Sequence, residues 1–240
     1  MNTQQTLSQL KGLKLYGMSG CYETQINQSA EKQPDAHTLI AMMAEAEEIS
    51  RIHQRTNLYL RLAKLRYSVL PEQILCGHER NLSKEQLQFL SETTFVDNAE
   101  NVLITGATGC GKSYLACALG RKACINGFKT IYHPMSRFIE VVATSRVDGT
   151  YTKLLNTVAK TPLLILDDFG MQPLDINMKL TLLQILEDRY KKYPVMITSQ
   201  VPVKEWHSRI NEPTIADAIL DRLTAIDHRV DLKGDSLRKK

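Results

Sequence analysis

The sequence contains no apolar run close to the roughly twenty residues that a membrane-spanning helix requires, so no membrane-spanning protein is expected. Its first residues lack a basic segment followed by an apolar one, so no signal peptide is expected and the protein should be cytoplasmic. Internal repeats and low-complexity tracts are also missing from the sequence. The apolar content is 43% of 240 residues, which is ample for a folded core.

Cysteine is scarce and has no paired pattern. The five cysteines are odd in number and form no C-x-x-C pair, so neither a disulfide framework nor a zinc site is supported. The net charge of +4 is only mildly basic and does not by itself indicate a nucleic-acid partner. Residues 51–66, however, carry arginine and lysine interleaved with apolar residues and no acidic residue. This basic amphipathic segment could track phosphates, dock an acidic partner or form a solvated face.

One short glycine-rich stretch indicates the chemistry. Residues 106–113 match the P-loop pattern G-x-x-x-x-G-K-[ST] at every required position, between an expected strand at 102–105 and an expected helix that starts at 114. Its glycines let backbone N–H groups and the helix N-terminus point at phosphate oxygens. We therefore assign nucleoside triphosphate binding to Gly106, Ala107, Thr108, Gly109, Cys110, Gly111, Lys112, Ser113 and Tyr114.

A second motif supplies the carboxylates that phosphoryl transfer needs. Residues 163–168 read Leu-Leu-Ile-Leu-Asp-Asp, a buried strand with two acids at its carboxyl end, where ligands of open α/β sheets bind. We expect Asp167 and the Ser113 hydroxyl to hold Mg²⁺, while Lys112 contacts the β- and γ-phosphates and Asp168 polarises the attacking water. The alternative is a strand that simply ends in a polar turn.

Strands and helices alternate after Pro71. Strands are expected at 129–133, 163–167 and 194–199, and helices at 135–144, 150–160 and 174–190. This alternation predicts an α/β fold with a central parallel sheet flanked by helices. We expect a small all-helical N-terminal domain for partner binding or assembly at 1–70 and the nucleotide-binding domain at 71–240. In its connector, 71–95, Ser83 and Gln86 fit a capping box.

Four stretches carry a resemblance to a known family. Residues 101–124 resemble the P-loop region of the IstB-type ATP-binding helper proteins of bacterial insertion sequences, and residues 163–170 resemble their acidic motif. Residues 197–207 (ITSQVPVKEWH), followed by 216–223 (ADAILDRL), resemble their most distinctive signature. The resemblance covers most of the chain. It implies an AAA+ P-loop NTPase related to DnaC-type helicase loaders, which hydrolyses ATP with Mg²⁺.

The resemblance also implies roles for residues outside the P-loop. Gln200 falls at the sensor 1 position, Arg222 at the arginine-finger position, and Arg238 is the candidate for sensor 2. A finger acts on the nucleotide of a neighbouring subunit, which implies a homo-oligomer, either a ring or a spiral. From the residues alone, Arg222 could instead pair with Asp221 or Asp217 on its own helix, and Arg238 could belong to a solvated tail. Asp168 departs from the broader AAA+ pattern, in which glutamate is usual.

The segment between residues 132 and 161 resembles the insertion by which initiator-type AAA+ proteins engage DNA. Its candidate contacts are Arg137, Arg146, Tyr151 and Lys153, unless these side chains are merely exposed helix surface. Arginine and lysine contacts to phosphates would bind duplex DNA with little sequence preference and strong salt dependence.

The resemblance thus implies an ATP-dependent, DNA-binding regulator. It would oligomerise on target DNA, recruit or stimulate the transposase encoded by the same element, and be reset by ATP hydrolysis. A replicative helicase loader of the DnaC type is the alternative, because it shares the ATPase core. A P-loop small-molecule kinase is a third possibility, but it predicts an arginine-rich lid and conflicts with the placement of Gln200 and Arg222.

Overall fold

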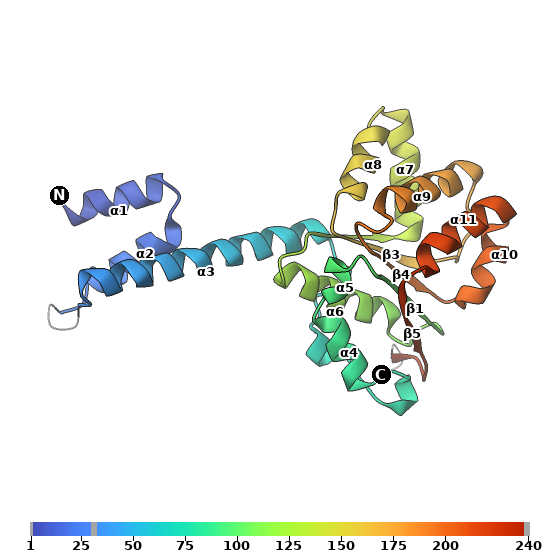
Figure 1. Cartoon of the computed structure of the whole chain (residues 1–240), viewed down its shortest axis with the longest axis horizontal. Coiled ribbons are helices and arrows are strands. Elements are labelled where there is room, and N and C mark those ends of the chain that lie inside the picture. The colour runs from blue at the N-terminus through green and yellow to red at the C-terminus, as the bar shows by residue number, and fades with distance from the viewer. Residues whose placement is uncertain (1, 30–32, 238–240) are drawn as a thin grey trace. The chain divides into compact units, whose positions relative to one another are not determined.

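The structure, a computed structural model, describes residues 2–29 and 33–237 and divides into two compact units. We call Met1–Leu58 the helical unit and Tyr59–Lys240 the P-loop unit. The division falls inside helix α3 (Ala36–Ala63), upstream of the domain boundary expected after residue 70. Residues 59–70 therefore belong to the P-loop unit (Figure 1).

The helical unit contains α1 (Thr3–Gly12), α2 (Tyr16–Ile26) and most of α3. The Glu47 carboxylate on α3 accepts hydrogen bonds from the N–H groups of Gly17 (2.8 Å) and Met18 (3.3 Å) in the first turn of α2. These N–H groups have no partner within their own helix, so a carboxylate stabilises them. Arg51 Nε lies 2.8 Å from Glu47 Oε1, and the Arg51 guanidinium and these N–H groups lower the pKa of Glu47. The N-terminal helical region is thus confirmed.

The P-loop unit is built on a five-stranded sheet in the order β2-β3-β4-β1-β5, with parallel pairing between all neighbours. The predicted parallel sheet is therefore confirmed. The strands are β1 (Asn101–Gly106), β2 (Thr130–Pro134), β3 (Leu163–Phe169), β4 (Val195–Ser199) and β5 (Asp227–Leu232).

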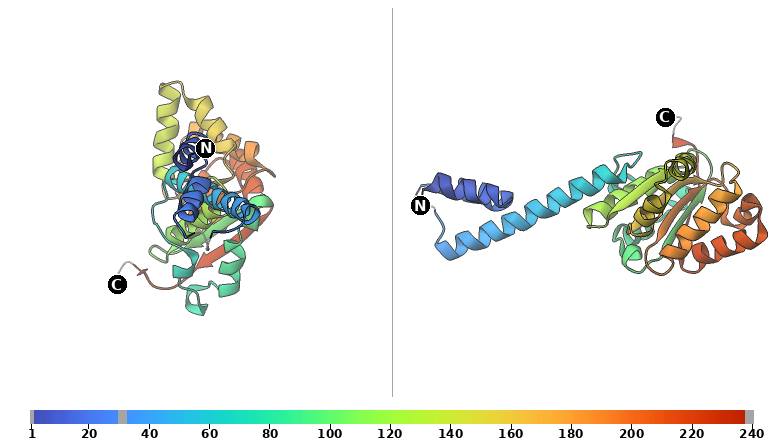
Figure 2. Two further views of the ribbon diagram at one scale, coloured as in Figure 1. Left: turned by 90° about the vertical axis from the view of Figure 1, so that its left-hand side faces the viewer. Right: turned by 90° about the horizontal axis from the view of Figure 1, so that it is seen from above.

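Helices cover both faces of this sheet, as Figure 2 shows. Successive residues of a strand point to opposite faces, and on β3 Leu164 and Leu166 enter one hydrophobic core while Leu163 and Ile165 enter the other. The first core packs against α7 (Met135–Val147), α8 (Tyr151–Ala159), α9 (Ile176–Arg189), α10 (Trp206–Ile210) and α11 (Pro213–Thr224). The second packs against α4 (Lys84–Ser91), α5 (Thr94–Asp97) and α6 (Lys112–Ile125).

Short 3-10 turns complete the connections, at η2 (Pro71–Gln73), η3 (His78–Arg80) and η4 (Val203–Glu205). In the connector, Ser83 caps α4 by accepting from the Gln86 N–H at 3.0 Å, as expected. The Gln86 side chain does not close the capping box; it donates to the Arg229 carbonyl on β5 at 3.1 Å. The connector is thereby tied to an edge strand far along the chain.

Buried Arg189, at the end of α9, fixes the loops that lead into β3 and β4. Its guanidinium donates to the carbonyls of Val158 (2.6 Å), Thr161 (2.7 Å), Pro162 (3.2 Å) and Pro194 (2.5 Å). Burial lowers its pKa to about 9. Since buried carbonyls need donors, this one side chain satisfies the two loops together. In the part of the chain that the structure describes, no helix is long and apolar enough to cross a membrane.

Candidate nucleotide site and arginine finger

The P-loop joins β1 to α6 through a backbone that requires glycine. Gly106 has a φ of +144°, and a Cβ there would lie 2.2 Å from the Leu232 carbonyl oxygen on β5. Gly109 has a φ of +84°, and a Cβ there would lie 2.2 Å from Ser236 Oγ. Both conformation and close approach exclude larger residues. The loop therefore takes the tight path that phosphate binding needs.

Lys112 points back into the loop that precedes it. Its Nζ donates to the Ala107 carbonyl at 2.9 Å, and the residue is only 5% exposed. Lys112 is also the first residue of α6, so its ammonium group and the positive end of the helix dipole lie together. This arrangement suits an anion such as a triphosphate.

The Asp167 carboxylate is fully buried and accepts hydrogen bonds from three hydroxyl groups. Ser113 Oγ donates at 2.8 Å from α6, Tyr132 Oη at 2.5 Å from β2, and Thr198 Oγ1 donates from β4. Burial and the neighbouring carboxylate raise the pKa of Tyr132, which keeps its hydroxyl protonated as a donor. Three elements, α6, β2 and β4, thus hold the carboxylate of β3 beside the P-loop.

This set of oxygen atoms fits Mg²⁺. The Ser113 hydroxyl and the Asp167 carboxylate lie together, and both are the hard oxygen ligands that Mg²⁺ prefers. Among residues 2–29 and 33–237, no group of three or more histidine, cysteine or acidic residues could hold a metal by itself. Mg²⁺ commonly binds through one or two protein groups together with the phosphates of its nucleotide.

Asp168 and Gln200 lie beside the P-loop in a shared cavity. Asp168 has a φ of +61°, and its N–H donates to Thr198 Oγ1 at 3.0 Å, where the pairing of β3 with β4 is irregular. Gln200 follows β4, and its Oε1 accepts a hydrogen bond from Thr108 Oγ1 of the P-loop. The acid and the polar residue that the sequence assigns to catalysis therefore sit beside the phosphate loop.

The cavity has a volume of about 480 Å³ and includes residues that sequence reasoning did not assign to the site. Among these, Tyr67 packs its ring against Tyr114 with centroids 5.7 Å apart, and the Arg66 guanidinium lies 5.4 Å from the Tyr67 centroid. The lining is formed by Arg66, Tyr67, Thr108, Gly109, Gly111, Lys112, Ser113, Tyr114, Asp168, Gln200 and Leu237.

The segment after β5 lies on the P-loop. The Leu237 N–H donates to the Gly109 carbonyl at 3.0 Å. Arg80 in η3 holds this segment, since its side chain donates to the Asp235 carbonyl at 3.0 Å and its carbonyl accepts from the Lys233 N–H at 3.1 Å. Arg238, the sensor 2 candidate, lies outside the described residues.

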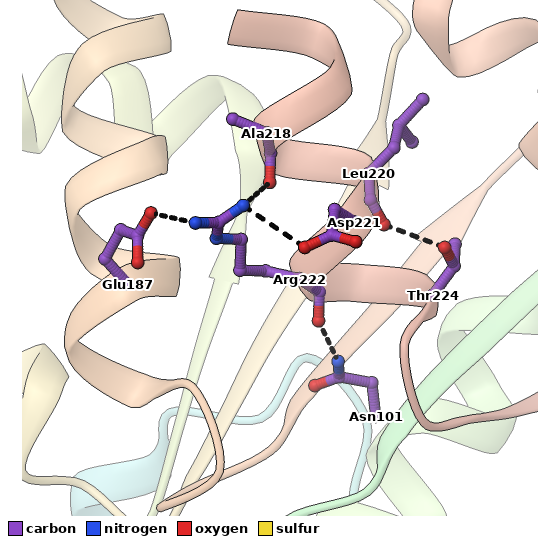
Figure 3. Close-up of polar contacts among 7 residues, drawn as sticks. All are labelled: Asn101, Glu187, Ala218, Leu220, Asp221, Arg222 and Thr224. Atoms are coloured by element: carbon purple, nitrogen blue, oxygen red, sulfur yellow. Dashed lines mark hydrogen bonds and ion pairs between the residues drawn. The ribbon is translucent and has the colours of Figure 1, made fainter.

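Arg222 on α11 is held by acidic groups of its own chain (Figure 3). One guanidinium nitrogen is 2.6 Å from Glu187 Oε1 on α9, and another is 3.2 Å from Asp221 Oδ2 and 3.3 Å from the Ala218 carbonyl. The local pair with Asp221 is therefore present, as the sequence allowed, together with a pair from a different helix. Asp217, the other expected partner, instead lies 3.2 Å from His207.

Arg222 lies at the opposite end of the sheet from the P-loop. Asn101, the first residue of β1, donates to the Arg222 carbonyl at 2.9 Å, whereas the P-loop starts at Gly106, the last residue of that strand. A strand rises about 3.3 Å per residue, so about 17 Å separate the two ends. Arg222 thus does not lie in the nucleotide cavity of its own chain.

The candidate DNA contacts lie on α7 and α8, but they differ in their surroundings. Arg137 is exposed and paired with Glu140 at 2.6 Å. Arg146 stacks on Tyr151, with its guanidinium carbon 4.1 Å from the ring centroid, and donates to Thr181 of α9 at 2.9 Å. Lys153 is exposed on α8. Arg146 and Tyr151 therefore join helices, while Arg137 and Lys153 face outward.

The fold is similar to solved AAA+ proteins. AMPPCP-bound DnaA from Aquifex aeolicus aligns with a TM-score of 0.59 and 20% identity over 72% of this chain and 52% of that chain. The DnaC helicase loader aligns with a TM-score of 0.55 and 20% identity over 71% of this chain and 100% of that chain. At such identities the likeness shows the fold alone, which confirms the predicted AAA+ architecture.

Sequence relatives identify the family. The insertion sequence ATP-binding protein y4pL of Sinorhizobium fredii is 40% identical over 98% of this chain and 96% of that protein. The ATP-binding protein of insertion sequence IS21 from Pseudomonas aeruginosa is 27% identical over 96% of this chain and 87% of that protein. Residues 8–240 match the family described as IstB-like ATP binding protein. The chain therefore belongs to the IstB-like family of insertion sequence ATP-binding proteins.

Proposed function

We propose that this protein is a Mg²⁺-dependent ATPase that assembles head to tail on duplex DNA and recruits or stimulates the transposase of its insertion sequence. Hydrolysis resets the assembly. The position of Arg222 carries this proposal, because the residue at the arginine-finger position lies at the end of the sheet remote from its own P-loop. As an arginine finger it would therefore act on the nucleotide of another subunit.

The chemistry follows from the nucleotide site. Lys112 and the N-terminus of α6 bind the phosphates. Ser113 and Asp167 would hold Mg²⁺, which would supply positive charge to the transferring phosphoryl group. Asp168 and Gln200 line the same cavity as Lys112. There Asp168 would orient the attacking water and Gln200 would contact the γ-phosphate. Arg222 from the next subunit completes the site, as arginine fingers do in other P-loop NTPases.

DNA binding is assigned to the hairpin formed by α7 and α8. Arg137 and Lys153 present exposed cationic groups there, which suit phosphates rather than base edges. Partner recognition is assigned to the helical unit, since the P-loop, the acidic strand, Gln200 and Arg222 all belong to the other unit. Membership of an insertion sequence family supports a transposase as the partner.

Mixing two inactive variants tests the composite site. Arg222→Ala keeps an intact P-loop but lacks the finger, and Asp168→Asn keeps the finger but lacks the acid. Random mixed oligomers contain interfaces with both intact halves, so ATP hydrolysis should recover to at most about a quarter of the wild-type rate. If mixed oligomers form, confirmed by differently tagged subunits, and hydrolysis stays absent, action between subunits is refuted.

A reconstituted assay separates the proposed function from helicase loading, which the DnaC-like fold leaves as the alternative. The protein, the transposase of the same element and a target plasmid should give strand transfer that depends on ATP. The same preparation should not load a replicative hexameric helicase onto single-stranded DNA. Loading without any stimulation of strand transfer would favour the helicase loader.

A further inference from the structure

The guanidinium group of Arg222 is occupied in the single chain. It contacts the carboxylates of Glu187 and Asp221 and the Ala218 carbonyl of α11 (Figure 3). The Arg222 side chain is 27% exposed. A guanidinium binds phosphate through the same N–H groups that bind carboxylates. Arg222 therefore cannot reach a neighbouring nucleotide without leaving these partners.

The backbone of Arg222 is fixed more firmly than its side chain. Asn101 is largely buried, and its Nδ2 donates to the Arg222 carbonyl at 2.9 Å and to the Leu223 carbonyl at 3.1 Å, while its Oδ1 accepts from the Val195 N–H at 2.8 Å. These bonds anchor the end of α11 to the start of β1 and β4. Only the side chain must change its position when the finger is used.

Glu187 is the stronger of the two acidic partners. It approaches Arg222 to 2.6 Å, whereas Asp221 lies at 3.2 Å and is 70% exposed. Glu187 also belongs to a different helix, so its pair with Arg222 joins α9 to α11, while Asp221 precedes Arg222 on the same helix. The Glu187 side chain is itself 46% exposed. In an ion pair that water reaches, the arginine can exchange its carboxylate for another anion.

We propose that Glu187 is a positioning residue that retains Arg222 in the free subunit and releases it when the triphosphate of a neighbouring subunit takes its place. The inference rests on the proposed function, in which Arg222 acts between subunits. Retention opposes assembly, because every new interface must first break this pair. Glu187 thereby sets the protein concentration at which the composite site forms.

The test compares variants of the full chain in the presence of Mg²⁺, a short DNA duplex and a slowly hydrolysed ATP analogue. Sedimentation measures the protein concentration of half-maximal assembly. Glu187→Gln keeps the shape and polarity of the side chain but removes its charge. Half-maximal assembly should then need about fivefold less protein, the equivalent of ~1 kcal/mol for one exposed ion pair. The protein concentration for half-maximal ATP hydrolysis should fall in parallel.

Two controls separate retention from other effects. Asp188→Asn removes an exposed charge at the next position of α9 and should assemble like the wild type. In the Arg222→Ala background, Glu187→Gln should change nothing further, because the residue that Glu187 retains is gone. A shift of similar size in that background would overturn the inference in favour of general charge repulsion. Thermal unfolding of each variant shows that it is folded.

The outcomes distinguish this inference from the proposed function. Suppose that Arg222→Ala loses hydrolysis but Glu187→Gln assembles at the wild-type or a higher protein concentration. Retention of Arg222 by Glu187 is then refuted, while the assignment of Arg222 as an arginine finger is supported. If Arg222→Ala hydrolyses ATP normally, or if the wild type does not assemble at any concentration, the composite site itself is wrong.

Discussion

Two adjacent aspartates at the end of β3 have different surroundings. Asp167 is fully buried and accepts from Ser113, Tyr132 and Thr198, so its carboxylate is fixed in place. Asp168 is half-buried and lines the nucleotide cavity, on backbone in the left-handed region. Aspartate and asparagine tolerate this conformation better than most residues. The first carboxylate is suited to hold an ion and the second to act on water.

Asp168→Asn should therefore separate nucleotide binding from hydrolysis. Asparagine keeps the left-handed backbone but cannot polarise water, so hydrolysis should fall about a hundredfold or more while ATP affinity changes little. Lys112→Ala, in contrast, should abolish productive binding, since it removes the charge inside the loop. Titration with a fluorescent ATP analogue and a phosphate-release assay measure the two effects. Normal turnover by Asp168→Asn would refute the catalytic assignment.

Cys117 on α6 should make the P-loop unit less stable in alkali. Burial raises its pKa from 9.0 to about 11. The unfolded chain therefore loses this proton first as the pH rises from 9 towards 11, and the free energy of unfolding falls. The stability that the folded state gains from keeping Cys117 protonated is at most ~3 kcal/mol. It is fully present below pH 9.

Cys117→Ala should reduce this alkaline loss. Buried Trp206, the one tryptophan of the chain, reports unfolding of the P-loop unit in urea at several pH values. Some slope should remain, because burial also raises the pKa of Cys124 and Tyr132. Cys21→Ala, in the helical unit, is the control. An identical pH dependence for Cys117→Ala and the wild type would contradict the prediction.

Among the elements, those with strong local patterns were predictable from the sequence. The apolar run at 163–166 and the run around 102–105 are buried central strands, so burial on both faces leaves a continuous apolar signal. Edge strand β5 was not predicted, because its sequence, Asp-His-Arg-Val-Asp-Leu, is mostly polar and pairs with only one neighbour, β1. A polar sequence of this kind is typical of a loop, so the sequence alone does not indicate a strand here.

The parts of the site that escaped prediction depend on contacts distant in sequence. Arg80 reaches the Asp235 carbonyl across 155 positions and holds Leu237 over the P-loop. Arg66 and Tyr67 enter the cavity just after α3 ends at Ala63. These segments are far from the P-loop in the sequence, so no motif or residue spacing identifies them as parts of the nucleotide site. The motif residues were predictable since one short loop and one strand end hold them.

The surroundings of the cationic residues on the α7–α8 hairpin decide which of them can be used to test DNA binding. Arg137→Glu combined with Lys153→Glu should lower affinity for duplex DNA and reduce the slope of log affinity against log salt by about two. Arg146 is unsuitable for this test, because it stacks on Tyr151 and bonds to α9. Filter binding over a salt series gives the slope.

The control for the hairpin is Arg209→Glu, which reverses an exposed arginine on α10, outside the hairpin. It should keep the wild-type slope. An unchanged slope for the hairpin variant would move the contact elsewhere, and the basic segment at 51–66 would be the next to test.

At the scale of the whole molecule, the unit that binds nucleotide begins earlier than the P-loop motif suggests. Arg66 and Tyr67 line the cavity, and the backbone of both residues acts on the Cys117 thiol of α6, where it opposes the rise in pKa that burial causes. Val69 is buried in the core that contains α6. Residues 59–70 are therefore part of the nucleotide-binding unit, while Met1–Leu58 forms a separate unit.

Two truncations should therefore behave differently. A chain that begins at Tyr59 keeps every residue that lines the cavity, so it should bind ATP like the full chain. A chain that begins at Pro71 loses Arg66 and Tyr67 and exposes Cys117, so it should bind ATP more weakly and unfold at a lower temperature. Neither should stimulate strand transfer by the transposase, because both lack the helical unit. Nucleotide titration, thermal unfolding and a reconstituted transposition assay measure the three properties. Equal ATP affinity of the two truncations would show that Arg66 and Tyr67 do not contribute to the site, and full stimulation by the longer one would remove partner binding from the helical unit.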